Sequence, residues 1–90
     1  EILSKFYMEY GYDDTVVDFI RKLYTFIRKK RIGSGKKPKT IYATLAYIAY
    51  KIYGYPITLK HAAKLAGITE VPIRNMVKEI MRKIQIEISI

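Results

Sequence analysis

The sequence has no cysteine and only one histidine among its 90 residues. Without cysteine, the chain can form neither a disulfide nor a thiolate zinc site, and it lacks a cysteine nucleophile. The single histidine, His61, has no second histidine to share a metal ion, and we expect it to be a surface or boundary residue. No serine has a recognisable catalytic base beside it in the sequence. Because these residues offer little for acid–base catalysis, we predict a protein that is not an enzyme and needs no cofactor or metal.

A long hydrophobic run is also missing. No apolar stretch approaches the roughly 18 residues that cross a membrane, and no signal peptide is recognisable. Half of the chain is hydrophobic, which argues against disorder, and 90 residues are enough for one domain with a modest core. We therefore expect an intracellular protein, in the cytoplasm or nucleus, without a membrane or small-molecule partner. Since the sequence starts at Glu1 and not at methionine, we expect a piece of a longer protein.

Acidic residues are scarce and unevenly placed. There are 8 acids against 17 lysines and arginines, a net charge of +9, and five of the acids fall within the first 18 residues. From Arg21 to Lys83, 16 bases face only two acids, Glu70 and Glu79. A surface of this sign attracts polyanions such as nucleic acid. Composition alone leaves an anionic membrane surface, or simple solubility, as alternatives.

The most informative stretch runs from residue 58 to residue 83, where the sequence predicts a helix, a tight turn and a second helix. Thr58 is a suitable N-cap for the first helix, and Gly67 can end it in a left-handed conformation. Thr69 is a suitable second N-cap. Pro72 falls in the first turn of the second helix, where proline is tolerated. This arrangement is typical of a helix-turn-helix.

Small and apolar residues in this stretch fit the same motif. Ala63 lets two helices cross closely, and Ile73 would fill the angle between them, helped by Ile68 and Met76. In a helix-turn-helix the second helix is held out to enter a major groove. Several side chains at its outward positions can read base edges or phosphates. The outward positions are Thr69, Glu70, Val71, Arg74, Asn75 and Lys78. Two packed helices that bind no nucleic acid are the alternative on this pattern alone.

Two helices are predicted in the first third of the chain. The first covers residues 1–10 and stops at Gly11. The second is capped by Asp13 or Asp14 and runs to about Arg31, ending in four consecutive bases. These bases either complement the negative end of the helix dipole or contact phosphate.

Residues 32–37 are expected to be the most flexible linker, and they lack the spacing of a phosphate-binding loop. A third helix opens at Pro38 and runs to about Tyr53. It is apolar nearly all round, which indicates a helix buried in the middle of a bundle. We expect the tyrosines in and after it to pack in the core and at its rim. They are Tyr42, Tyr47, Tyr50, Tyr53 and Tyr55. The tail after Ile84 is compatible with a fraying helix or an extended segment.

The stretch from residue 38 to residue 74 resembles a cyclin-like repeat of transcription initiation factor B, a general factor of archaea and eukaryotes. In that family a proline opens an alanine-rich central helix, and a threonine, a hydrophobic residue and a lysine begin a short one. An A-G-[VI] turn and a V-x-I-R sequence then follow. The matching residues are Pro38, Ala43, Ala46, Tyr47, Ala49, Thr58, Leu59, Lys60, Ala66, Gly67, Ile68, Val71, Ile73 and Arg74. Residues 2–11 are similar to the first helix of the repeat.

The resemblance implies an all-α fold, a five-helix cyclin-like bundle that ends in the helix-turn-helix. It implies a single domain over residues 1–90, taken from a longer factor whose zinc ribbon and first repeat are not in this sequence. The V-x-I-R sequence is most similar to the second, C-terminal repeat. In that repeat the helix-turn-helix enters the major groove next to a TATA box, at the B recognition element. The implied partners are promoter DNA, TATA-binding protein and RNA polymerase.

Site residues follow from the resemblance together with the outward positions. The resemblance implies an apolar contact to a base edge from Val71 and a hydrogen bond to a base from Arg74. The full set of base-contact candidates is Val71, Arg74, Asn75 and Lys78. The phosphate-contact candidates are Lys36, Lys37, Lys39, Lys60 and Thr69. Two other functions stay open, a cyclin-like module that binds proteins without reading DNA, and a free-standing repressor that acts as a dimer.

Overall fold

The computed structural model describes the backbone of residues 1–89 and the side chains of residues 1–85. This part of the chain contains five helices joined by short connections, and no strand. The helices are α1 (Ile2–Tyr10), α2 (Asp14–Lys29), α3 (Pro38–Ile52), α4 (Leu59–Ala66) and α5 (Glu70–Ser89). This confirms the predicted all-α class and the order of its elements. Helix α2 ends two residues earlier than expected, and the tail that the sequence left open continues α5 through Ser89, while Ile90 lies outside the described residues. Within the described range, no helix combines the length and apolarity that a membrane span requires.

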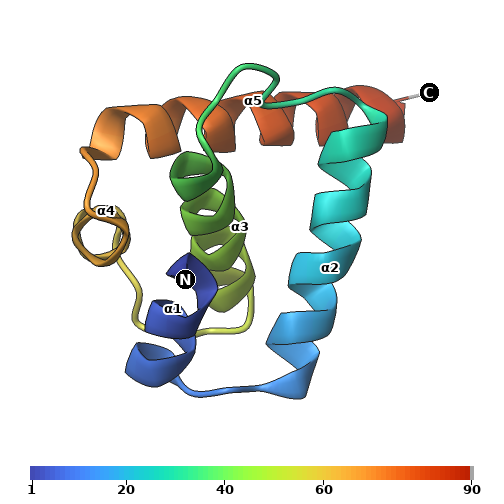
Figure 1. Ribbon diagram of the computed structural model, residues 1–90. Helices are drawn as coiled ribbons and strands as arrows, with labels where there is room; N and C mark the ends of the chain where they lie inside the picture. Colours follow the sequence, from blue (N-terminus) through green and yellow to red (C-terminus); the bar gives the residue numbers. More distant parts are fainter. Residues whose placement is uncertain (90) are drawn as a thin grey trace.

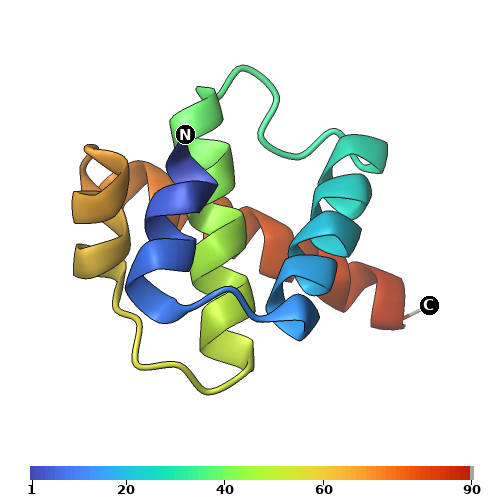
Figure 2. The same ribbon diagram turned by 60° about the horizontal axis from the view of Figure 1, so that its bottom comes forward.

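Helix α3 is the centre of the bundle, and the other four helices pack around it (Figures 1 and 2). Its alanines allow this close packing, since Ala43, Ala46 and Ala49 are each 0% exposed. Thr44 is also fully buried, and its hydroxyl donates to the Thr40 carbonyl at 2.7 Å. The polar group is therefore satisfied inside the core. The prediction of a buried central helix is confirmed.

Tyrosine hydroxyl groups join the two turns at the end of the bundle opposite α5. The Tyr50 hydroxyl donates to the Gly11 carbonyl at 2.7 Å, and burial raises the pKa of Tyr50 to about 12. The Tyr55 hydroxyl donates to Asp13 Oδ2 at 2.5 Å. Asp13 also caps α2, because its Oδ1 accepts from the Thr15 backbone N–H at 2.9 Å. These contacts confirm a packing role for both tyrosines and decide the capping residue in favour of Asp13.

The connection between α2 and α3, residues 30–37, corrects the expectation of a flexible linker in its first part. Ile32 is only 5% exposed, and Gly33 is buried with a φ of +77°. A Cβ atom at Gly33 would lie 2.8 Å from Cε of Met76, so this backbone touches α5 closely. The α2–α3 connection is therefore packed against α5 at Gly33, whereas Ser34, Gly35 and Lys37 are exposed. Local composition does not reveal this contact, because it depends on a residue more than 40 positions away.

The Asp13–Tyr55 contact makes the acid stability of the fold testable. The hydrogen bond from Tyr55 is the largest cause that lowers the Asp13 pKa below its ordinary 3.8. Ionised Asp13 therefore stabilises the fold above pH 3.8, and this stabilisation is lost as the pH falls through its lower folded-state pKa. We expect Tyr55→Phe to lower the free energy of unfolding at pH 7 and to reduce its decline in acid.

Urea unfolding at a series of pH values from about 7 to 2 measures this difference. Tyr53→Phe is the matched control, because Tyr53 is 44% exposed at the end of α3. The control should follow the wild-type curve. Parallel curves for wild type and Tyr55→Phe would contradict the role of the hydrogen bond.

Candidate nucleic-acid interface

Helix α4 ends at a glycine corner, as the sequence predicts. Gly67 has φ 70° and ψ 36°, in the left-handed region. Its N–H donates to the Lys64 carbonyl at 3.2 Å, and the Ile68 N–H donates to the Ala63 carbonyl at 3.0 Å. This pair of bonds is a Schellman motif, which satisfies the last carbonyl groups of a helix. The corner turns the chain sharply from α4 into α5.

The start of α4 is fixed by its predicted N-cap and by a contact with α1. Thr58 Oγ1 accepts from the backbone N–H of His61 at 3.1 Å, which confirms the cap. The His61 ring lies with Nε2 3.0 Å from Glu9 Oε2 and makes an edge contact with Tyr10. His61 is half-buried, so the structure confirms its assignment as a boundary residue.

Helix α5 crosses α4 through the small and apolar residues that the sequence singled out. Ala63 is 4% exposed, and Ile73 and Met76 are each 0% exposed. Helix α5 begins directly after Thr69, and Pro72 lies in its first turn. Residues on the opposite side of a helix from a buried stripe must face solvent. The predicted helix-turn-helix packing is therefore confirmed.

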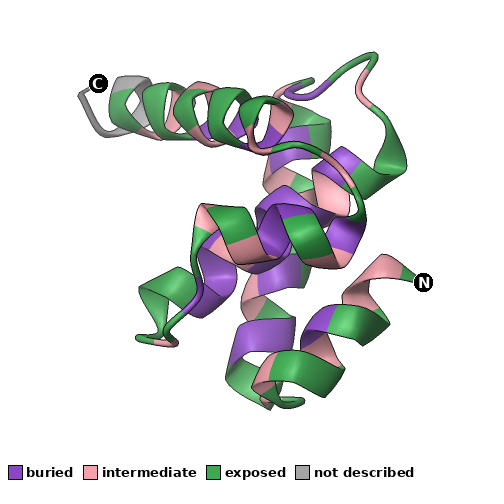
Figure 3. Ribbon diagram, turned by 90° about the vertical axis from the view of Figure 1, so that its left-hand side faces the viewer, coloured by how far each residue is buried: buried purple, intermediate pink, exposed green. Residues whose placement is uncertain are grey.

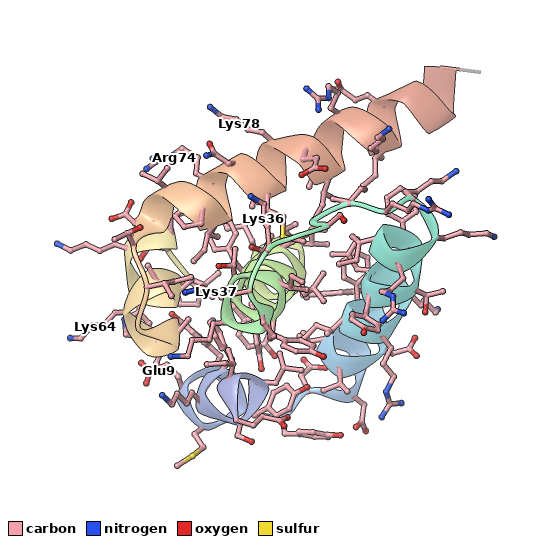
Figure 4. All side chains as sticks on the ribbon, turned by 45° about the horizontal axis from the view of Figure 1, so that its top comes forward. Glu9, Lys36, Lys37, Lys64, Arg74 and Lys78 are labelled. Carbon is pink, nitrogen blue, oxygen red and sulfur yellow. The ribbon has the colours of Figure 1, made fainter. Side chains whose placement is uncertain are left out.

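The outward face of α5 is exposed over the residues whose side chains are described, up to residue 85 (Figure 3). Val71 is 54% exposed, and the side chain of Arg74 is 45% exposed. The other exposed candidates on or beside this face are Thr69, Asn75 and Lys78. Figure 4 shows Arg74 and Lys78 pointing away from the bundle. These are the positions at which side chains could reach a groove.

A hollow between α4 and α5, here called the α4–α5 hollow, brings several site candidates together. It has a volume of about 630 Å³. Its lining residues are Lys60, Ala63, Lys64, Ile68, Thr69, Glu70, Val71 and Arg74. Within it, Arg74 Nη2 donates to Glu70 Oε1 at 3.2 Å. Four of the predicted contact residues therefore share one surface.

The three lysines around the start of α3 divide between two places. Lys36 lines a separate hollow of about 380 Å³ together with Arg28 and Arg31. Lys37 is exposed, and Figure 4 shows Lys36 and Lys37 beside the α2–α3 connection. Lys39 instead lines a third hollow, of about 350 Å³, with the first residues of α1. The structure thus does not bring Lys39 to the α4–α5 hollow.

Helix α2 has acids at its start and bases at its end. Asp13 and Asp14 lie at the turn between α1 and α2, and α5 crosses the other end (Figure 1). Of the four consecutive bases that end α2, Arg28 donates to the Tyr24 hydroxyl at 2.9 Å, and its guanidinium lies 5.7 Å from that ring centroid. This polarity favours one approach direction for a polyanion.

Sequence analysis missed two cations that the structure adds to this surface. Lys64 lines the α4–α5 hollow and projects from α4 in Figure 4. Arg82 is exposed on α5, four residues after Lys78. The sequence contained a pattern that could have identified both cations. Lys64 follows Lys60 by four residues, and Arg82 follows Lys78 by four, so each pair shares a helix face. The charged surface is therefore longer than the predicted one.

The chemistry of this surface suits recognition by hydrogen bonds and charge. A guanidinium group can donate two parallel hydrogen bonds to guanine, and an amide can pair with adenine in the same way. Lysine ammonium groups suit phosphate oxygens. The fold and surface together define a cyclin-like helical bundle that carries a helix-turn-helix with a basic outer face.

Comparison with known proteins assigns the family. The family model described as "Transcription factor TFIIB repeat" matches residues 2–83, and this chain belongs to that family. The match includes α1 to α4 and most of α5.

Archaeal relatives agree with the assignment. Transcription initiation factor IIB 2 of Thermoplasma acidophilum is 48% identical over 58 residues, which is 64% of this chain and 19% of that protein. Transcription initiation factor IIB of Ignicoccus hospitalis is 39% identical over 67 residues, 74% of this chain and 21% of that protein. That of Pyrococcus furiosus is 31% identical over 90 residues, 100% of this chain and 30% of that protein. The chain thus spans about a fifth to a third of these relatives.

A conservative substitution tests the packing beneath the candidate surface. Ile73→Val removes one methylene from a residue that is 0% exposed, and we expect it to lower the free energy of unfolding by about 0.5–1.5 kcal/mol. Val71→Ala, on the exposed face of the same helix, should change it by less than about 0.5 kcal/mol. Urea unfolding measures both. Equal losses from the two variants would contradict the assignment of the two faces.

Proposed function

We propose that this chain is a promoter-binding repeat of a transcription initiation factor, with α5 as the recognition helix in the major groove. The observation that carries the proposal is the exposed face of α5, where Val71 and Arg74 stand on the side opposite the buried Ile73. The glycine corner sets the angle of this face to α4. Lys60 and Lys64 of α4 line the hollow beside this face. Lys36 and Lys37 lie at the α2–α3 connection, whose Gly33 packs on Met76 of α5 (Figure 4). We infer phosphate contacts at these lysines.

The place on the promoter follows from the similarity to the C-terminal repeat of the factor. Val71, Ile73 and Arg74 supply its V-x-I-R sequence at the start of α5. We infer binding in the major groove next to a TATA box, at the B recognition element, together with TATA-binding protein. RNA polymerase would be the further partner of the longer factor. The names of the archaeal relatives, each a transcription initiation factor, support this role.

Arg74→Ala tests base reading by α5. We expect the variant to bind the preferred duplex about 1–3 kcal/mol more weakly and to lose sequence preference, because a base-contacting arginine discriminates between sequences. Lys37→Ala should instead weaken binding to all duplexes alike, since phosphate contacts carry no sequence information. Equilibrium titration of the preferred duplex and of a scrambled one measures both effects.

Arg21→Ala is the matched control for the loss of one arginine. Arg21 is exposed on α2 and lines a hollow with residues of α1 and α3, away from the α4–α5 hollow. The control should keep wild-type sequence preference. Equal losses from Arg74→Ala on the preferred and scrambled duplexes would contradict base reading by Arg74.

Salt dependence tests the phosphate contacts as a group. If four to six phosphates are contacted, log K should fall against log salt concentration with a slope of roughly −4 to −5. Titrations between about 50 and 300 mM salt give this slope. A slope near zero would rule out a binding mode driven by phosphate contacts.

Selection from random duplex DNA, with and without TATA-binding protein, tests the function as a whole. Enrichment of one sequence beside a TATA box supports the proposal. Failure to bind any duplex at low salt, with binding to a protein partner retained, would favour a protein-interaction module. A palindromic site, together with self-association in sedimentation, would favour a free-standing repressor.

A further inference from the structure

One acidic side chain stands within the basic surface. Glu70 lines the α4–α5 hollow, and the ionisable side chains beside it there are three bases, Lys60, Lys64 and Arg74. Its side chain is 38% exposed, so its charge is accessible to a ligand that enters the hollow. A carboxylate in this place repels phosphate oxygens and lowers the affinity for any polyanion. Its presence on a surface that should bind DNA calls for a function.

Glu70 contacts the arginine that the proposed function places on a base. Arg74 Nη2 lies 3.2 Å from Glu70 Oε1, and their spacing of four residues places both side chains on one face of α5. A guanidinium group has five N–H donors, so one bond to a carboxylate leaves enough donors for the two acceptors of a guanine edge. Arg74 can therefore keep its partner while it reads a base.

The contact reduces the conformational freedom of a long side chain. An unrestrained arginine loses rotamer entropy when it is ordered on binding, and this loss reduces affinity for the matching base. With its guanidinium held by Glu70, Arg74 is oriented before DNA arrives. The carboxylate also disfavours binding through phosphates alone. The orientation of Arg74 increases the ratio of preferred to random binding. The repulsion instead lowers the affinity for both duplexes, because both present the same phosphates.

We propose that Glu70 is a positioning residue for DNA reading, which holds the Arg74 guanidinium toward the base edge and weakens non-specific binding. The proposal rests on the proposed function, because it needs Arg74 to contact a base. It assigns Glu70 an effect on sequence preference, through Arg74, that is separate from any effect on folding.

A structural effect of Glu70 is expected as well and must be separated from this one. Glu70 is the first residue of α5, where a negative charge favours the positive end of the helix dipole. Loss of that charge would change the stability of the fold. A change in stability alone would leave the ratio of affinities for the preferred and scrambled duplexes unchanged. The ratio is therefore the informative measurement.

The experiment compares Glu70→Ala and Glu70→Gln, each in the wild-type chain and with Arg74→Ala. Glutamine keeps an oxygen acceptor at the same length and removes the charge. Glu79→Ala is the matched control, because Glu79 is the other acid among the α5 residues whose side chains are described, and it does not line the hollow. Affinities are measured for the preferred duplex, for a duplex with the Arg74 base pair changed, and for a scrambled duplex.

We expect Glu70→Ala to reduce the preference at the Arg74 base pair about two- to tenfold, because Arg74 must then be ordered on binding. Glu70→Gln should keep that preference within about twofold, since its oxygen still accepts from the guanidinium. Both variants should bind the scrambled duplex about two- to fivefold more tightly, because a repulsive charge is gone. With Arg74→Ala present, Glu70→Ala should cause no further loss of preference.

Two results would overturn the positioning role of Glu70 and leave the proposed function standing. One is an unchanged preference in Glu70→Ala while Arg74→Ala still loses it. The other is an equal loss from Glu70→Ala with and without Arg74, which would show that Glu70 reads a base directly. If Arg74→Ala itself leaves the preference unchanged, the proposed function fails and this inference fails with it. Unfolding curves for all variants confirm that each measured chain is folded.

Discussion

The burial of Ile73 in the core is the constraint on which the candidate surface depends. Ile73, Met76 and Ile80 form one stripe of α5, and each is 0% exposed. A helix turns by about 100° per residue, so burial of this stripe determines which residues lie opposite. The exposure of Val71, Arg74 and Lys78 is therefore a consequence of core packing, and the surface needs no separate stabilisation. The glycine corner at residue 67 then sets the direction in which this face points.

The small residues of α3 make this arrangement possible in so short a chain. With alanines at the contacts, four helices approach one central helix, and the long cationic side chains remain on the outside. At the end of the bundle opposite α5, Asp13 acts as a cap and accepts a hydrogen bond from Tyr55. Structural roles account for much of the negative charge, whereas most of the positive charge stays accessible. The molecule therefore keeps more accessible positive charge than negative charge.

Sequence reasoning succeeded where the cause is local. A threonine that caps three residues ahead, a glycine that takes a positive φ, and apolar residues at helical spacing all depend on near neighbours. It therefore predicted the helices, the corner and the outward face of α5. It could not predict that Gly33 packs on Met76, that Tyr55 reaches Asp13, or that Lys39 lies apart from the α4–α5 hollow. These depend on distances between elements, which a pattern within one helix does not contain.

The packing of Gly33 against Met76 has a consequence for how DNA geometry would be sensed. It attaches the α2–α3 connection, which carries Lys36, to the middle of α5. In the proposed function, a backbone contact beside this junction and a base contact from α5 then come from two elements that pack on each other, which limits their separation. Groove width varies with DNA sequence, and a duplex that mismatches this separation must deform or give up one contact. Some selectivity would therefore arise at base pairs that no side chain touches.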